Sequence, residues 1–138
     1  MMMRNLDLFN CAALEIMHTS LEIFPNMVSV DPNDIAARVR DYFIENEESD
    51  LDSQALFHTC HATIKWLNQE GFIIIEQTFI SGKCRIVLTQ KGLNALNSVP
   101  TFADSEKRSF GQYFLEGVKP LPFSLMGNLM VDFFKSIS

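Results

Sequence analysis

Apolar residues in the first third of the chain recur every three or four positions, which is the repeat of one helix face. The segment Leu6–Phe24 shows this repeat and predicts an amphipathic helix, which Pro25 ends. A second helix is expected after Asp31-Pro32, because a capping acid followed by proline at the first helical position is a typical helix start. Residues 26–30 are expected to link the two helices.

The segment 52–96 predicts a helix, a hairpin and a further helix. Asp52 can cap the first of these, and Gly71 suits the left-handed position after its end. The runs 73–75 and 84–88 have the composition or alternation of strands and flank the turn signal Ser81-Gly82. We therefore expect three helices, a hairpin over roughly Ile73–Thr89, and a helix from Gln90. The apolar stripe of the third helix consists of Leu56, Cys60, Thr63, Ile64 and Leu67.

Two stretches of this segment resemble the winged helix-turn-helix superfamily. Residues 64–73, IKWLNQEGFI, are similar to the end of a recognition helix entering a wing. Residues 85–92, RIVLTQKG, are similar to the strand-to-helix join LTxxG of MarR- and PadR-type regulators. The resemblance implies a mainly α fold with a two-stranded β-hairpin wing, of α+β class, extended by N-terminal and C-terminal helices. It also implies a DNA-binding protein that regulates transcription.

The exposed side of the third helix and the wing carry the candidate DNA contacts. They are His58, His61, Lys65, Lys83 and Arg85. Typical recognition helices carry more side chains that reach base edges. If Lys91 also contacts phosphate, the lysine and arginine side chains give a logarithmic salt slope of about −3.6. We therefore expect weak binding to double-stranded DNA per monomer.

The last part of the chain predicts a helical extension. We expect residues 1–99 to form the winged-helix domain and residues 100–138 to pack on that domain or on a second subunit. The segment Phe123–Ile137 is the most apolar predicted helix, yet it is too short to span a bilayer. Because one domain seldom buries nearly all of an added helix, we expect a homodimer. The expected dimer contacts are Phe123, Met126, Leu129, Met130, Phe133, Phe134 and Ile137.

The charge of −6 is unevenly distributed. Residues 1–52 carry three basic and eleven acidic side chains, a balance of −8, whereas residues 53–138 carry eight and six, a balance of +2. The acidic turn 45–50 is either a solvated loop or a segment that repels nucleic acid or captures a basic protein partner. Three scattered cysteines and an N-terminus without a long apolar run predict a cytoplasmic chain, for which a membrane partner is not expected.

The cluster His58-Thr59-Cys60-His61 is the part of the sequence most similar to a chemical site. The two histidines can share a helix face, as zinc ligands sometimes do, but Cys60 faces the predicted core. No second pair stands at ligand spacing, and adjacent helical residues do not face each other as a Cys-His pair must. We expect no metal, no cofactor and no enzymatic activity.

Two functions therefore remain open. The first is a dimeric winged-helix protein that binds DNA through the third helix and the wing. The second is an acidic winged-helix module that binds a protein and not DNA, using its acidic half and apolar tail. The resemblance favours the first, whereas the charge favours the second.

Overall fold

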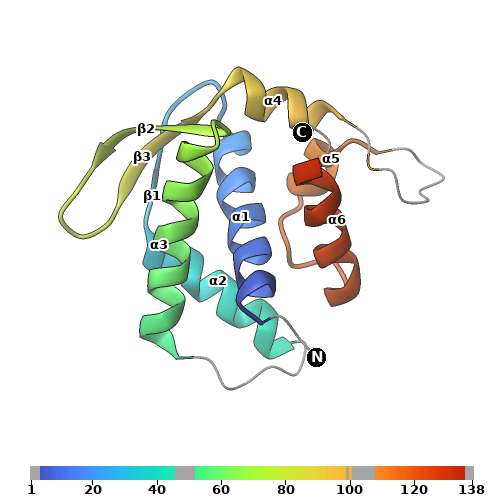
Figure 1. Cartoon of the computed structure of the whole chain (residues 1–138), viewed down its shortest axis with the longest axis horizontal. Coiled ribbons are helices and arrows are strands. Elements are labelled where there is room, and N and C mark those ends of the chain that lie inside the picture. The colour runs from blue at the N-terminus through green and yellow to red at the C-terminus, as the bar shows by residue number, and fades with distance from the viewer. Residues whose placement is uncertain (1–3, 46–51, 99, 101–107, 136–138) are drawn as a thin grey trace.

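In the computed structural model, helices and one small sheet surround the first helix (Figure 1). The structure describes residues 4–45, 52–98, 100 and 108–135. Within these residues the chain is mainly helical with a three-stranded antiparallel sheet, as expected for the predicted α+β class. The elements are α1 (Arg4–Glu22), β1 (Val28–Val30), α2 (Pro32–Glu45), α3 (Ser53–Gln69), β2 (Ile73–Thr78), β3 (Cys84–Leu88), α4 (Gln90–Asn97), α5 (Phe110–Phe114) and α6 (Phe123–Lys135).

Helix α1 lies between other helices. Figure 1 shows α3 on one side of it, α5 and α6 on the other, and α2 crossing its lower end, and α1 contacts all four. The stretch Cys11–Leu14 has no exposed surface, and neither have Ile16 and Met17. Two alanines in this stretch let the neighbouring elements approach closely, because their side chains are short. The predicted helix is confirmed, but it is buried on several sides and not along one stripe.

The sheet has one strand more than the sequence predicted. Residues 26–30 were expected to be a link, but Val28–Val30 pair antiparallel with β3, opposite Ile86 and Cys84. The strand order is β1-β3-β2, so the predicted hairpin over Ile73–Thr89 is confirmed and gains a third strand. A three-residue strand is too short to show alternation, and its partner lies far along the chain. The two-stranded expectation was wrong for that reason.

The join between hairpin and α4 is closed by Thr89. Its hydroxyl donates to the carbonyl of Phe72 at 3.1 Å and accepts from the backbone N–H of Gly92 at 3.0 Å. Gly71, with φ of 87°, ends the turn after α3. A Cβ atom on Gly92 would press into the carbonyl oxygen of Phe72. The predicted turn and cap residues therefore hold the hairpin and α4 together, and α4 begins at Gln90 as expected.

Helix α6 is covered by the chain itself. Met126, Leu129, Met130 and Phe133 have no exposed surface. The ring of Phe133 lies 5.0–5.7 Å from the rings of Phe72, Phe110 and Phe114, measured between ring centroids.

Half-buried Phe134 packs on another side of α6, against Phe9 and Trp66. The four fully buried side chains therefore need no second subunit for cover, because other parts of the chain, among them α5 and the ring of Phe72, supply it. The expected homodimer itself stays a prediction. The expected dimer contacts Phe123 and Ile137 have side chains outside the described residues.

One apolar cluster joins both parts of the expected division at residue 99. It runs from Leu8 in α1 to Phe133 in α6, so residues 108–135 pack on the domain. Within the described ranges, none of the helices combines the length and apolar character needed to cross a bilayer. Most of the acidic turn, residues 46–50, lies outside the described residues.

Replacing Gly92 with alanine should destabilise the chain by about 1–3 kcal/mol, because the new methyl group overlaps the Phe72 backbone and forces it to move. Gly127→Ala in α6 is the matched control, since a Cβ there meets nothing within 4 Å. This control should leave the stability unchanged or raise it by up to about 1 kcal/mol. Urea denaturation followed by circular dichroism measures both. Equal stability of the two variants would contradict the packing at Gly92.

Candidate functional site

Helix α3 presents the predicted contact residues on the side that faces away from the core. Asp52 caps the helix by accepting a hydrogen bond from the backbone of Gln54. The predicted stripe is buried as expected, which turns His58 and Lys65 outward and leaves them exposed. His61 is half-buried, because the ring of Phe57 stacks on it with a centroid separation of 6.1 Å. The three predicted α3 residues therefore share one side of the helix but not one degree of exposure.

The hairpin lies along this side of α3. At one end, the Asn68 side-chain oxygen accepts from the backbone N–H of Ile75 at 2.9 Å. At the other end, the tip residue Gly82 lies against the rings of Phe57 and His61. A Cβ atom placed on Gly82 would lie 3.2 Å from the Phe57 ring and 3.7 Å from the His61 ring. These two contacts bring the hairpin residues Lys83 and Arg85 to the same part of the molecule as α3. We call α3 and the hairpin together the α3–hairpin surface.

The α3–hairpin surface holds cations that have no ionic partner within the described part of the chain. Lys65, Lys83 and Arg85 are exposed and form no ion pair with the described residues. Glu76, on the bulge of β2, is the acid carried by the hairpin itself. The surface is therefore modestly cationic, whereas the chain as a whole is acidic.

Several other basic side chains are engaged elsewhere. Arg38 pairs with Glu15, Arg40 donates to the Ser53 hydroxyl, and Arg108 lies over the Tyr113 ring. Lys91, which was expected to add a phosphate contact, donates to the Glu70 carbonyl at 2.6 Å and lies over the Phe72 ring. Three candidate phosphate contacts remain, so the expected salt slope falls to about −2.7.

The His58–Cys60–His61 cluster lacks the geometry of a catalytic or metal site. Cys60 is fully buried, and burial raises the pKa of its thiol to about 12, so it is protonated at neutral pH. Among the residues that the structure describes, no group of three His, Cys, Asp or Glu side chains is placed to hold a metal. Burial is also the main cause that lowers the pKa of His61 below 6.5, followed by the charges of Lys65 and His58. His61 is therefore neutral at pH 7 and adds no charge to the surface.

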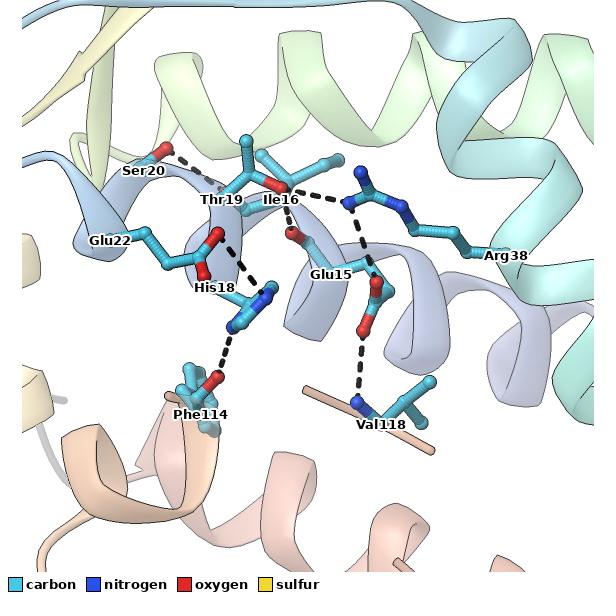
Figure 2. A network of polar contacts seen from close by, with 9 residues as sticks. All are labelled: Glu15, Ile16, His18, Thr19, Ser20, Glu22, Arg38, Phe114 and Val118. Carbon is cyan, nitrogen blue, oxygen red and sulfur yellow. Dashed lines mark hydrogen bonds and ion pairs between the residues drawn. The ribbon is translucent and has the colours of Figure 1, made fainter. Parts of the chain in front are cut away.

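A second polar site, which the sequence did not reveal, lies between α1, α2 and the turn after α5 (Figure 2). One carboxylate oxygen of Glu15 accepts from the backbone N–H of Val118 at 2.9 Å, and the other lies 3.6 Å from Arg38. One turn along α1, the His18 Nδ1 donates to the carbonyl of Phe114 at 2.5 Å. The carboxylate is buried, whereas the Arg38 side chain is 49% exposed. We call this network the Glu15 latch.

The Glu15 latch borders a cavity of about 260 Å³ that Asp41, Tyr42 and Lys119 also line. Both oxygens of Glu15 already have partners, and the Tyr42 hydroxyl donates to the carbonyl of Leu121 at 2.9 Å. The polar groups of the latch and the Tyr42 hydroxyl therefore already have partners within the chain. The sequence pointed only weakly to this network, through an acid next to the buried face of α1. The partners Phe114 and Val118 could not be identified, because they lie about a hundred positions away.

Glu15→Ala should destabilise the chain by about 1–3 kcal/mol, because it leaves the buried N–H of Val118 without an acceptor. Arg38→Ala is the comparison. It should cost less than about 1 kcal/mol, since the guanidinium is half exposed and water in the adjoining cavity can replace it. Thermal and urea unfolding of both variants test this ranking. A larger loss for Arg38→Ala would show that the ion pair, and not the backbone hydrogen bond, dominates the latch.

His61 should make stability depend on pH. Its pKa in the folded chain is below 6.5, so as pH falls the unfolded chain takes up the proton first. The contribution of His61 is therefore complete above pH 6.5 and declines as pH falls through 6.5 towards the lower folded pKa. His61→Gln should flatten the plot of stability against pH in this range. Lys65→Ala should make the loss of stability smaller, because it removes a positive charge that lowers the pKa of His61. Urea midpoints between about pH 7.5 and 5.5, roughly one unit on either side of the ordinary histidine pKa, test both variants. An unchanged curve for His61→Gln would contradict the assignment.

No family model, no curated protein and no solved structure matches the chain. The two sites therefore have to be interpreted from their own geometry. Of these, the α3–hairpin surface has exposed and unengaged side chains, whereas the polar groups of the Glu15 latch are occupied. The α3–hairpin surface is the candidate for function.

Proposed function

We propose that the chain is a winged-helix domain that binds double-stranded DNA through the α3–hairpin surface. The order of elements supports this reading, because α2 and α3 are consecutive helices followed directly by a hairpin. In a helix-turn-helix, the second helix of such a pair enters the major groove. Here α3 is that helix, and β2 and β3 form the wing.

The observation that carries the proposal is the location of the unengaged cations. Lys65 is exposed on α3, and Lys83 and Arg85 are exposed on the hairpin that lies along it. Phosphate contacts by lysine and arginine supply most of the sequence-independent affinity for DNA. His58 is exposed beside them and is positioned to reach a base edge or a phosphate. A role in transcription regulation and a cytoplasmic location follow from this proposal, and the latter agrees with three cysteines that are all unbridged.

A second candidate is a protein-interaction module. It is favoured by the net charge of −6 and by exposed apolar residues between α1 and β1, namely Ile23, Phe24 and Met27. Such a module would bind its protein partner without using Lys65, Lys83 and Arg85. It predicts no measurable affinity for duplex DNA at low salt, so one titration separates the two candidates.

The double variant Lys83→Glu/Arg85→Glu should weaken binding to random-sequence duplex DNA. Each lost phosphate contact removes about 0.9 from the logarithmic salt slope, so the slope should fall by about 1.8. Fluorescence anisotropy at several salt concentrations, starting at about 50 mM where such contacts are strong, measures affinity and slope together.

Lys119→Glu is the matched control for this experiment. Lys119 is an exposed lysine beside the Glu15 latch, away from α3 and the hairpin. It should leave the slope unchanged. If the double variant binds DNA as tightly as the wild type, and circular dichroism shows an intact fold, the proposed contact surface is refuted. A wild-type chain that does not bind duplex DNA would favour the protein-interaction module.

A further inference from the structure

The tip of the hairpin carries apolar side chains where the fold does not require them. Ile80 is fully exposed at 108%, and the preceding Phe79 is 39% exposed. Hairpin turns are normally built from Gly, Asn, Asp, Ser and Pro, each of which suits the backbone of a turn. A β-branched residue at the apex adds no burial within this chain. Its exposure therefore calls for an explanation outside the fold.

The tip is also held rigidly. The N–H of Phe79 donates to the carbonyl of Lys83 at 2.8 Å, and the N–H of Gly82 donates to the carbonyl of Phe79 at 2.9 Å. The ring of Phe57 on α3 packs against the turn, since a Cβ atom placed on Gly82 would lie 3.2 Å from it. A tip that is braced in this way presents Ile80 in a fixed position and pays little ordering entropy on binding.

Two cations follow the apolar apex along the chain, Lys83 directly before β3 and Arg85 on β3. Both side chains are exposed and have no ionic partner among the described residues. An apolar tip beside unpaired cations fits a partner that offers apolar surface next to dense negative charge. Duplex DNA does so in its minor groove, where base steps can part between two rows of phosphates. The groove is about 6 Å wide, so it admits side chains but not a whole hairpin.

We propose that the hairpin tip is a minor-groove wedge. Ile80, with Phe79 beside it, inserts at a base step and partly unstacks it, while Lys83 and Arg85 bind the flanking phosphates. This inference rests on the proposed DNA binding and adds a mode of recognition to it. A wedge favours steps that unstack easily, such as TA and CA, and so supplies sequence preference through deformability. It thereby compensates for the few side chains on α3 that could read base edges.

The test uses a short duplex with 2-aminopurine next to a central TA step and a donor–acceptor dye pair at its ends. 2-Aminopurine brightens when it is unstacked, and energy transfer between the ends rises when the duplex bends. The wild-type chain should produce both signals. Ile80→Ser should abolish them and lower affinity by roughly tenfold, the order expected for losing one buried isoleucine contact. Its salt slope should stay unchanged, because the phosphate contacts remain.

Ile44→Ser is the matched control, since Ile44 is 50% exposed on α2 and outside the α3–hairpin surface. It should behave as the wild type in every readout. Binding of the wild type without either optical signal would overturn the wedge and leave the proposed function standing. Absence of any DNA binding by the wild type would overturn both. Ile80→Ser that matches the wild type would also overturn the wedge.

A lipid surface is the other partner with apolar and anionic parts, and the same variants distinguish it. Cosedimentation with vesicles of phosphatidylcholine and phosphatidylserine should show no binding that depends on Ile80. If Ile80→Ser removes vesicle binding but leaves the DNA signals intact, the tip contacts lipid and the wedge is wrong.

Discussion

The burial of α1 on several sides is the constraint on which the rest of the structure depends. Its fully buried residues lie between α3 on one side and α5 and α6 on the other, and α2 crosses one end of the helix. Ala12 and Ala13 allow this close approach, because larger side chains would separate the surrounding helices. The position of α3 follows from this packing, since its buried stripe faces α1. The hairpin then lies along the free side of α3, so the candidate surface is a consequence of where α1 sits.

Local signals were enough to predict most of the elements. Asp52, Gly71 and Thr89 act through their own turns and caps, so the bounds of α3, the hairpin and α4 could be predicted without tertiary information. The strand β1 could not, because three residues show no period and the pairing of Val28 with Ile86 is decided by the sheet. Helix α6 was identified, but its cover was not, since aromatic rings from α1, α3, the turn before β2 and α5 converge on it.

The candidate site was also predictable only in part from the sequence. That His58 and Lys65 face outward follows from the helical repeat of α3, and both are exposed as expected. The partial burial of His61 and the engagement of Lys91 depend on contacts with Phe57 and Glu70 that periodicity does not describe. The Glu15 latch lay beyond sequence reasoning, because its hydrogen bond joins residues 103 positions apart. Net charge alone also misleads here, since an acidic chain carries the exposed cations Lys65, Lys83 and Arg85 on the α3–hairpin surface.

The Glu15 latch sets an order of events during synthesis. Glu15 emerges from the ribosome early, whereas the N–H of Val118 that it binds emerges near the end. Until then α1 lacks the cover of α5 and α6, and Glu15 lacks the backbone N–H that it accepts from in the folded chain. The complete core therefore requires α5 and α6, the last helices of the described chain to be synthesised. For the same reason, residues 1–99 are a poor choice for an expression fragment, although the helices, hairpin and α4 all lie within them.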